Sequence, residues 1–121
     1  MMSESSNNKP YDLEERTLLF AKGIRIFIKT LKMTIANVED SKQLIRSSGS
    51  IGANYIEANE ALSKKNFQFR AKISRKEAKE CVYWLRLISE TNVLQNERQA
   101  KDLIQEATEL KKILSAIIEK S

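Results

Sequence analysis

Lysine and arginine side chains are concentrated in one short stretch of the chain, residues 64–80. Seven basic residues stand there against two acidic ones, while the rest of the sequence is balanced, so this stretch accounts for the whole formal net charge of +5. Basic side chains neutralise phosphates without reading base sequence, so the stretch could bind the backbone of RNA or DNA. The alternative is a solvated helix face that nearby carboxylates partly balance. The candidate nucleic-acid-binding residues are Lys64, Lys65, Lys72, Arg75, Lys76 and Lys79.

Few other residues have types and spacings that favour catalysis or metal binding. The chain has no histidine, which removes the commonest metal ligand and general base. Glu57 lies one helical turn before Glu60 and about three turns after Arg46, so these side chains share a helical face. A carboxylate-bridged metal site in a helical bundle, however, expects Glu-x-x-His pairs. We therefore interpret Arg46 and Glu57 as a structural ion pair, within or between helices, and predict no catalytic residue, metal, cofactor or small-molecule substrate.

The single cysteine and two neighbouring glycines also favour structural roles. Cys81 has no partner for an intrachain disulfide, which favours a reducing compartment, and it lies on the expected core side of its helix. Gly49 and Gly52 are not followed by the Gly-Lys-Ser/Thr of a phosphate-binding loop. Because Gly inside a helix costs roughly 1 kcal/mol relative to Ala, the glycines indicate close helix packing. The predicted small-residue face comprises Ser48, Gly49, Gly52 and Ala53.

Four helices would position these residues. One proline and three glycines in 121 residues leave little to interrupt helices, and apolar residues recur at spacings of three and four. Such spacing is typical of helices that cross at about 20°, and short connections make neighbouring helices antiparallel. We predict an all-α fold, an antiparallel up-down-up-down four-helix bundle over 12–121. The predicted helices span about 13–32, 40–62, 64–90 and 96–119, after a disordered tail at 1–11.

Each predicted helix has a stripe of core residues. The stripe of the first helix is Leu13, Thr17, Phe20, Ile24, Phe27 and Leu31, and that of the second is Ile45, Ser48, Gly52, Tyr55, Asn59 and Leu62. The stripe of the third helix is Phe67, Ala71, Ser74, Ala78, Cys81, Leu85 and Ile88, and Ser63 is its predicted N-cap.

The third helix carries a second apolar strip beside its core stripe. A monomeric bundle buries one face of each helix, so an extra aromatic surface indicates a second contact. We predict that it joins copies of the chain, although Tyr83 and Trp84 beside Arg86 could instead stack on bases. The predicted oligomer interface comprises Phe69, Ile73, Tyr83, Trp84 and Leu87.

Two stretches resemble a known family. QLIRSSGSIGANYIEANEALSKKNF and KEAKECVYWLRL are similar to segments of four-helix-bundle proteins encoded by intervening sequences of bacterial large-subunit (23S) ribosomal RNA genes. The resemblance covers about Tyr11 to Glu90 and implies a homopentameric ring without an established biochemical activity. It also implies kinship with the accessory variability protein of diversity-generating retroelements, a basic pentameric bundle that binds a reverse transcriptase and nucleic acid. The chain differs from the commonest pattern at Cys81, where threonine is frequent, and at Ala58, where many members have glycine.

Two functional hypotheses follow. The first is a non-enzymatic, oligomeric assembly or adaptor protein associated with a ribonucleoprotein or a reverse transcriptase. The second is a sequence-indifferent RNA- or DNA-binding protein that uses the basic face of the third helix. The start, MMSESSNNKP, lacks the apolar core of a signal peptide, and no window approaches the ~18 apolar residues of a membrane span. We therefore predict a cytoplasmic protein without a membrane partner.

Overall fold

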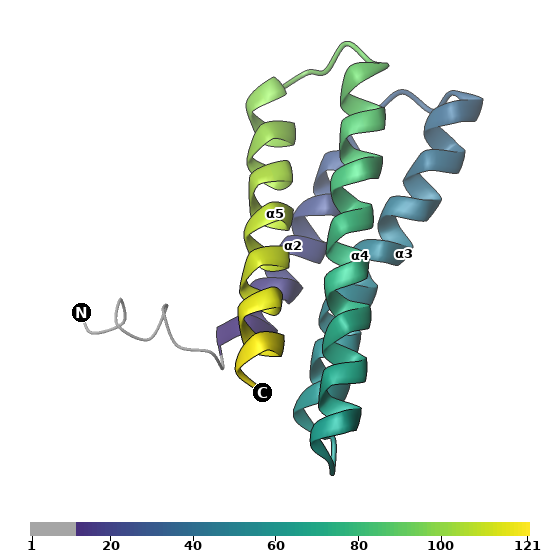
Figure 1. The fold of residues 1–121 in the computed structure, drawn as a ribbon. Coiled ribbons are helices and arrows are strands. Elements are labelled where there is room, and N and C mark those ends of the chain that lie inside the picture. Colours follow the sequence, from purple (N-terminus) through teal and green to yellow (C-terminus); the bar gives the residue numbers. More distant parts are fainter. Residues whose placement is uncertain (1–11) are drawn as a thin grey trace.

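The computed structural model describes residues 12–121, which form four helices (Figure 1). The α2–α3 and α4–α5 connections lie at one end of the bundle and the α3–α4 turn lies at the other, so consecutive helices are antiparallel. This confirms the predicted all-α, up-down-up-down bundle for the described residues. The predicted disordered tail at 1–11 lies outside them. The helices are α2 (Asp12–Ile28), α3 (Ile35–Asn59), α4 (Lys64–Glu90) and α5 (Glu97–Lys120).

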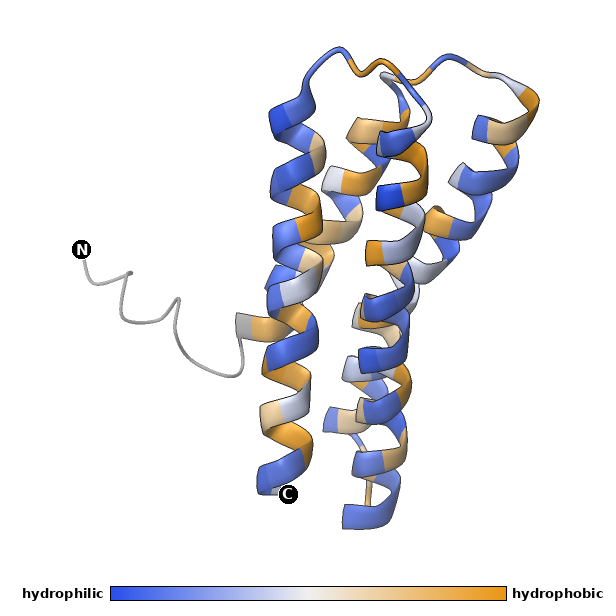
Figure 2. Cartoon of the chain, turned by 45° about the horizontal axis from the view of Figure 1, so that its top comes forward, coloured by the Kyte–Doolittle hydropathy of each residue, from blue (hydrophilic) through white to orange (hydrophobic). Residues whose placement is uncertain are grey.

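The four helices form a square in which each has two neighbours. Helix α3 packs against α2 and α4, and α5 packs against α4 and α2. Helices α2 and α4 therefore lie at opposite corners, and their outer faces point in opposite directions. Hydropathy follows this arrangement, because apolar positions turn mainly towards the interior and polar positions turn outwards (Figure 2).

The predicted core stripes of the first and third helices are confirmed. All six residues of the first predicted stripe are buried, although Leu31 lies beyond the end of α2 at Ile28. They include the polar Thr17, whose hydroxyl donates to the Glu14 carbonyl at 2.9 Å. In α4 the stripe is buried from Ala71 to Ile88, and Phe67 is half-buried against a small second cluster with Ile118. The 4-3 spacing predicts the buried face of both helices correctly, because one continuous stripe of each faces the interior of the bundle.

The predicted stripe of the second helix is wrong by about one position. Helix α3 begins at Ile35, five residues earlier than expected, because Thr34 caps it by accepting from the Asn37 amide at 3.1 Å. Its core face is centred on Leu44 and Ile51, whereas the predicted core residues Ile45, Asn59 and Leu62 are exposed. The buried residues of α3 are Asn37, Ser41, Leu44, Ser47, Ser48, Ile51, Tyr55 and Ala58.

Small polar residues let α3 and α4 approach closely. The Ser74 hydroxyl is fully buried and donates to the backbone carbonyl of Ile51 at 2.7 Å, which brings a side chain of α4 onto the backbone of α3. Further along, Arg70 donates to the Asn54 side chain at 3.2 Å. These bonds fix the antiparallel register of the two helices.

Pairs of polar side chains also hold neighbouring helices together. Asn37 and Asn92 exchange amide hydrogen bonds of 2.8 and 3.0 Å, which ties the start of α3 to the end of α4. Arg16 of α2 forms a bidentate pair with Glu106 of α5, at 2.9 and 2.7 Å, and its hydrogen bond to Glu106 raises the pKa of Arg16. Ser63 accepts from the Asn66 amide at 3.1 Å and so caps α4 as expected.

Candidate interaction surfaces

The candidate nucleic-acid-binding residues are spread over two sides of α4. Arg75 is half-buried and donates to Ser115 of α5 at 3.3 Å, so this side of α4 faces the α4–α5 seam, where Lys79 also lies. Lys64, Lys65, Lys72, Lys76 and Lys79 are exposed. Among the six, and within the described residues, only Lys76 has a carboxylate within 4.0 Å, that of Glu77 at 3.6 Å. Five cations thus remain without a nearby carboxylate.

Glu77, the carboxylate 3.6 Å from Lys76, is buried and not solvated. The residue is 6% exposed, and its Oε1 atom has no hydrogen-bond partner among the described residues. The buried hydroxyl of Ser47 in α3 also has no hydrogen-bond partner among the described residues. On α4, a carboxylate thus lies largely out of solvent three residues after Ser74, the residue that bonds to the backbone of α3.

Cys81 is fully buried among the core residues, as its stripe position predicted. Burial raises the pKa of the thiol, and the negative charges of Glu77 and Glu80 raise it further. A raised pKa keeps the thiol protonated and unreactive at pH values at which an ordinary cysteine begins to ionise.

We therefore expect Cys81 to resist alkylation by iodoacetamide at about pH 8 in the folded protein and to react fully in guanidinium chloride. Mass spectrometry of timed samples measures both rates. Rapid, stoichiometric labelling of the native protein would show that the thiol is accessible and the core position misassigned.

The predicted interface strip on α4 divides into three parts. Phe69 is 58% exposed and Ile73 is half-buried on the same outer face. Trp84 packs against the main core, so it is partly a fold residue. The Tyr83 and Trp84 rings meet edge to face at 5.0 Å, and Tyr83 is 60% exposed. Tyr83 and Leu87 open towards α5.

A groove of about 420 Å³ lies between α4 and α5. Its apolar surface comes from Val82, Tyr83 and Leu87, and basic side chains from both helices border it. The residues that line it are Lys79, Val82, Tyr83, Arg86, Leu87 and Glu90 of α4, and Thr108 and Lys111 of α5.

Two residues of the predicted small-residue face of α3, Gly52 and Ser48, lie at a close contact with α2. A Cβ atom added at Gly52 would lie 2.7 Å from Thr17 Oγ1, so α2 and α3 approach too closely there for any side chain. Ser48 is buried beside this point and accepts from Arg25 at 3.3 Å.

Gly49 and Ala53 are not at a close contact, which corrects their predicted role. A Cβ at Gly49 would meet only the tip of Arg25, at 3.7 Å, and Ala53 is exposed. Both residues instead line an open groove of about 370 Å³ between α2 and α3.

An exposed apolar surface on α2 and α3 was missed in the sequence. Leu19 and Ile26, two turns apart on α2, are 55% and 58% exposed, and Leu18 is 49% exposed. Ile56 of α3 lines the same groove as Leu18. The signal was present, because large apolar residues lie off the core stripe of this helix as they do in α4. We call Leu18, Leu19, Ile26, Ile45 and Ile56 the α2–α3 apolar face.

The predicted ion pair between Arg46 and Glu57 is not present within the described chain. Arg46 donates instead to Gln43 at 2.7 Å on the exposed side of α3. Both residues lie in one continuous helix, where eleven residues correspond to about 16 Å, which is too far for direct contact.

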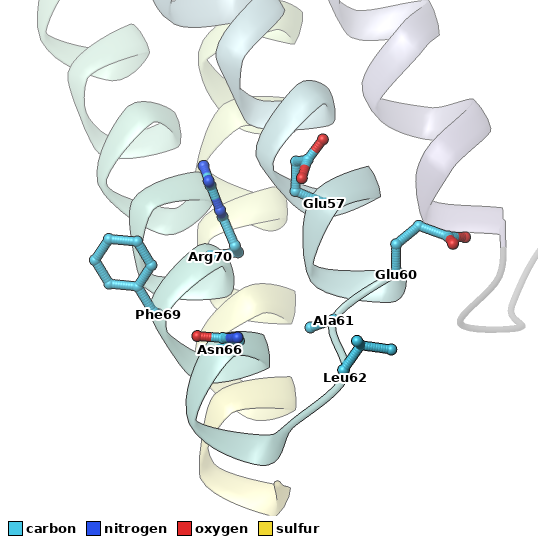
Figure 3. Close-up of a pocket in the computed structure, with 7 residues that line it drawn as sticks. All are labelled: Glu57, Glu60, Ala61, Leu62, Asn66, Phe69 and Arg70. Carbon is cyan, nitrogen blue, oxygen red and sulfur yellow. The ribbon is translucent and has the colours of Figure 1, made fainter.

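Glu57 lies at the corner where α3 meets α4 (Figure 3). A hollow of about 310 Å³ is bordered there by Glu57 of α3, by Glu60 directly after α3, and by Asn66, Phe69 and Arg70 of α4. The Arg70 guanidinium lies 5.7 Å from the centre of the Phe69 ring. This corner adds mixed charge beside the exposed Phe69.

Two features are absent from the described residues. No group of three or more acidic, cysteine or histidine residues there could hold a metal ion. Within 12–121 no helix is both long and apolar enough to cross a membrane.

The fold and these surfaces define an all-α bundle with exposed apolar and basic faces. The model of the 23S rRNA-intervening sequence protein family matches residues 12–116, and the chain belongs to this family. The match confirms the family resemblance drawn from the α3 and α4 motifs.

A solved structure from Bacteroides thetaiotaomicron is similar over most of the chain. It is a protein of unknown function from the S23 ribosomal protein family, 36% identical, with a TM-score of 0.78. The similarity covers 88% of this chain and 97% of that one. The curated proteins yielded no match.

Proposed function

We propose that this chain is a non-enzymatic assembly protein that forms a ring and presents surfaces to a partner. The observation that carries the proposal is the α2–α3 apolar face, a set of five large side chains between 36% and 58% exposed on two adjacent helices, of which Leu18 and Ile56 line one groove. Exposed apolar side chains that share a groove commonly mark a contact with a partner. Association of copies would bury these side chains.

The positions of the apolar surfaces favour a head-to-tail contact. The α2–α3 apolar face lies on α2 and α3, whereas Phe69 and Ile73 lie on the outer face of α4, which is not a close neighbour of α2. Two different patches on different helices can join copies heterologously, and such contacts close into rings when the rotation permits. We propose a homopentamer, the number that the family resemblance implies.

The proposed partner is a ribonucleoprotein component in the cytoplasm. The family is described by its encoding within 23S ribosomal RNA genes, and the Bacteroides protein is assigned to a ribosomal protein family. A reverse transcriptase, the partner implied by kinship with the retroelement protein, is the other protein that this proposal admits.

A specific observation supports direct nucleic-acid binding as the second candidate. Five basic residues at or near α4 have no carboxylate within 4.0 Å. Repetition around a ring would let several weak patches act together. The apolar faces nevertheless favour the assembly function, because phosphate binding does not require them.

A filter-binding titration separates the two candidates. At about 0.15 M salt, where charges are screened beyond ~8 Å, we expect no retention of generic RNA or duplex DNA at tens of micromolar protein. The control is Lys72→Glu/Arg75→Glu/Lys79→Glu. Retention that falls steeply with salt and is abolished in this variant would establish the nucleic-acid function instead.

A further inference from the structure

We propose that the α4–α5 groove binds a short, acidic, amphipathic helix of a partner protein. The inference rests on the proposed adaptor function and names the chemistry of the partner. It concerns a surface distinct from the α2–α3 apolar face and from the Phe69 end of α4.

The apolar surface of the groove favours a peptide over a nucleic acid. Val82 and Leu87 are half-buried in the groove wall, and Tyr83 is 60% exposed at its edge. Apolar side chains of a helix would fill such a surface and exclude water from it. A phosphate backbone would gain nothing from Val82 and Leu87, whereas a base could use only Tyr83.

The charges at the rim of the groove determine which sign of charge a partner should carry. Lys79 of α4 and Lys111 of α5 border the groove from its two walls, and neither has a carboxylate within 4.0 Å among the described residues. A third cation, Arg86, is held by Glu90 at 3.1 Å. Because the unneutralised cations lie on opposite walls, an apolar stripe flanked on both sides by Asp or Glu would match the groove.

The length of the groove sets the length of the partner. On α4 the lining residues run from Lys79 to Glu90, eleven helical steps or about 16 Å along the helix axis. A partner helix of about three turns would fill it, with apolar anchors three and four residues apart.

A display experiment tests the proposal without a known partner. Random peptides of about 14 residues are selected on the wild-type protein and counter-selected on Lys79→Glu/Lys111→Glu. We expect groove-dependent peptides with Asp and Glu flanking apolar residues at helical spacing. In fluorescence anisotropy, one selected peptide should bind the double variant at least about tenfold more weakly than the wild type.

The control variant is Lys64→Glu/Lys65→Glu, which makes the same total charge change at two exposed positions of α4 outside the groove. It should keep peptide affinity within about twofold of the wild type. The single tryptophan gives a second readout, because Trp84 contacts Tyr83 and its emission should change on binding to the wild type. Circular dichroism checks that each variant is folded.

Five results would overturn the proposal. The first four are the absence of groove-dependent peptides, the selection of basic or unpatterned peptides, equal loss of affinity in the control variant, and displacement of the peptide by an equal concentration of oligo-uridine RNA. A change in the oligomeric mass of Lys79→Glu/Lys111→Glu would also overturn it, by assigning the groove to the contact between copies. Peptide binding by a monomeric chain would instead refute the ring and leave the groove assignment standing.

Discussion

Leu19→Glu/Ile26→Glu is expected to convert the assembled protein into monomers and to leave its helix content unchanged. Both side chains are more than half exposed in the single chain, so the bundle itself loses little when they become charged. In a contact between copies, each carboxylate would lose its hydration without gaining a partner, which costs several kcal/mol. Light scattering measures the mass, and circular dichroism measures the helix content.

The opposite face provides the matched variant. Phe69→Glu on α4 should dissociate the ring in the same way, because Phe69 is exposed and lies at the other corner of the bundle. Trp84→Glu would not test this, since Trp84 also packs on the core. Gln105→Glu, at an exposed position of α5, controls for added charge and should keep the assembled mass.

Mixing the two dissociated variants tests the head-to-tail geometry. Each variant retains one intact face, so an equimolar mixture should form one-to-one heterodimers through the single undamaged contact. An isologous contact predicts a different result, because one of the two variants would then remain a homodimer by itself. Native mass spectrometry distinguishes these species.

Gly52→Leu is expected to destabilise the bundle more than any other substitution of a glycine. A Cβ alone would lie 2.7 Å from Thr17 Oγ1 and 3.2 Å from Thr17 Cβ, and Thr17 is 2% exposed. Since neither helix backbone can yield cheaply, a leucine must push α2 and α3 apart. We expect a loss of about 3 kcal/mol, or about 10 °C in Tm for a domain of this size.

The other glycines are matched controls. Gly49→Ala should raise stability by up to about 1 kcal/mol, because its Cβ meets only a flexible arginine tip at 3.7 Å. At Gly23 a Cβ would lie 3.2 Å from the Leu103 side chain, so this position also faces a neighbouring helix. Gly23→Leu should therefore destabilise, but less than Gly52→Leu, since Leu103 is a flexible side chain.

A double variant tests whether Thr17 is the residue that a side chain introduced at position 52 would clash with. Thr17→Ala removes the hydroxyl that a new Cβ would meet, so Gly52→Ala should be less damaging in that background than alone. Equal losses in both backgrounds, measured by thermal unfolding at one protein concentration, would show that Thr17 is not the obstacle. An increase in Tm for Gly52→Leu would refute the close approach itself.

Local patterns predicted the parts of the fold that depend on one helix at a time. The 4-3 stripes of α2 and α4 are correct because their core residues are large and regularly spaced. Helix α3 was misregistered because serine and glycine occupy its core face, so hydrophobicity gives no clear centre there. Its true start depended on the Thr34 cap, which the spacing of apolar residues does not reveal.

Interaction surfaces were harder to predict because they depend on which helices become neighbours. The sequence identified exposed Phe69 and Tyr83 but not the α2–α3 apolar face, since Leu18 and Ile56 meet only after α2 packs on α3. Lys111 joins Lys79 at one groove for the same reason, although 32 positions separate them. The predicted Arg46–Glu57 ion pair failed for a different reason. The two residues share a helical face, but they lie too many turns apart to meet.

Self-association is the central claim, and the mass of the wild-type protein in solution tests it most directly. Size-exclusion chromatography with multi-angle light scattering at micromolar concentration should give about 70 kDa, five copies of the 13.9 kDa chain. Another closed ring would correct the number and keep the head-to-tail contact. A single species of 13.9 kDa that persists as the concentration is raised would contradict the account.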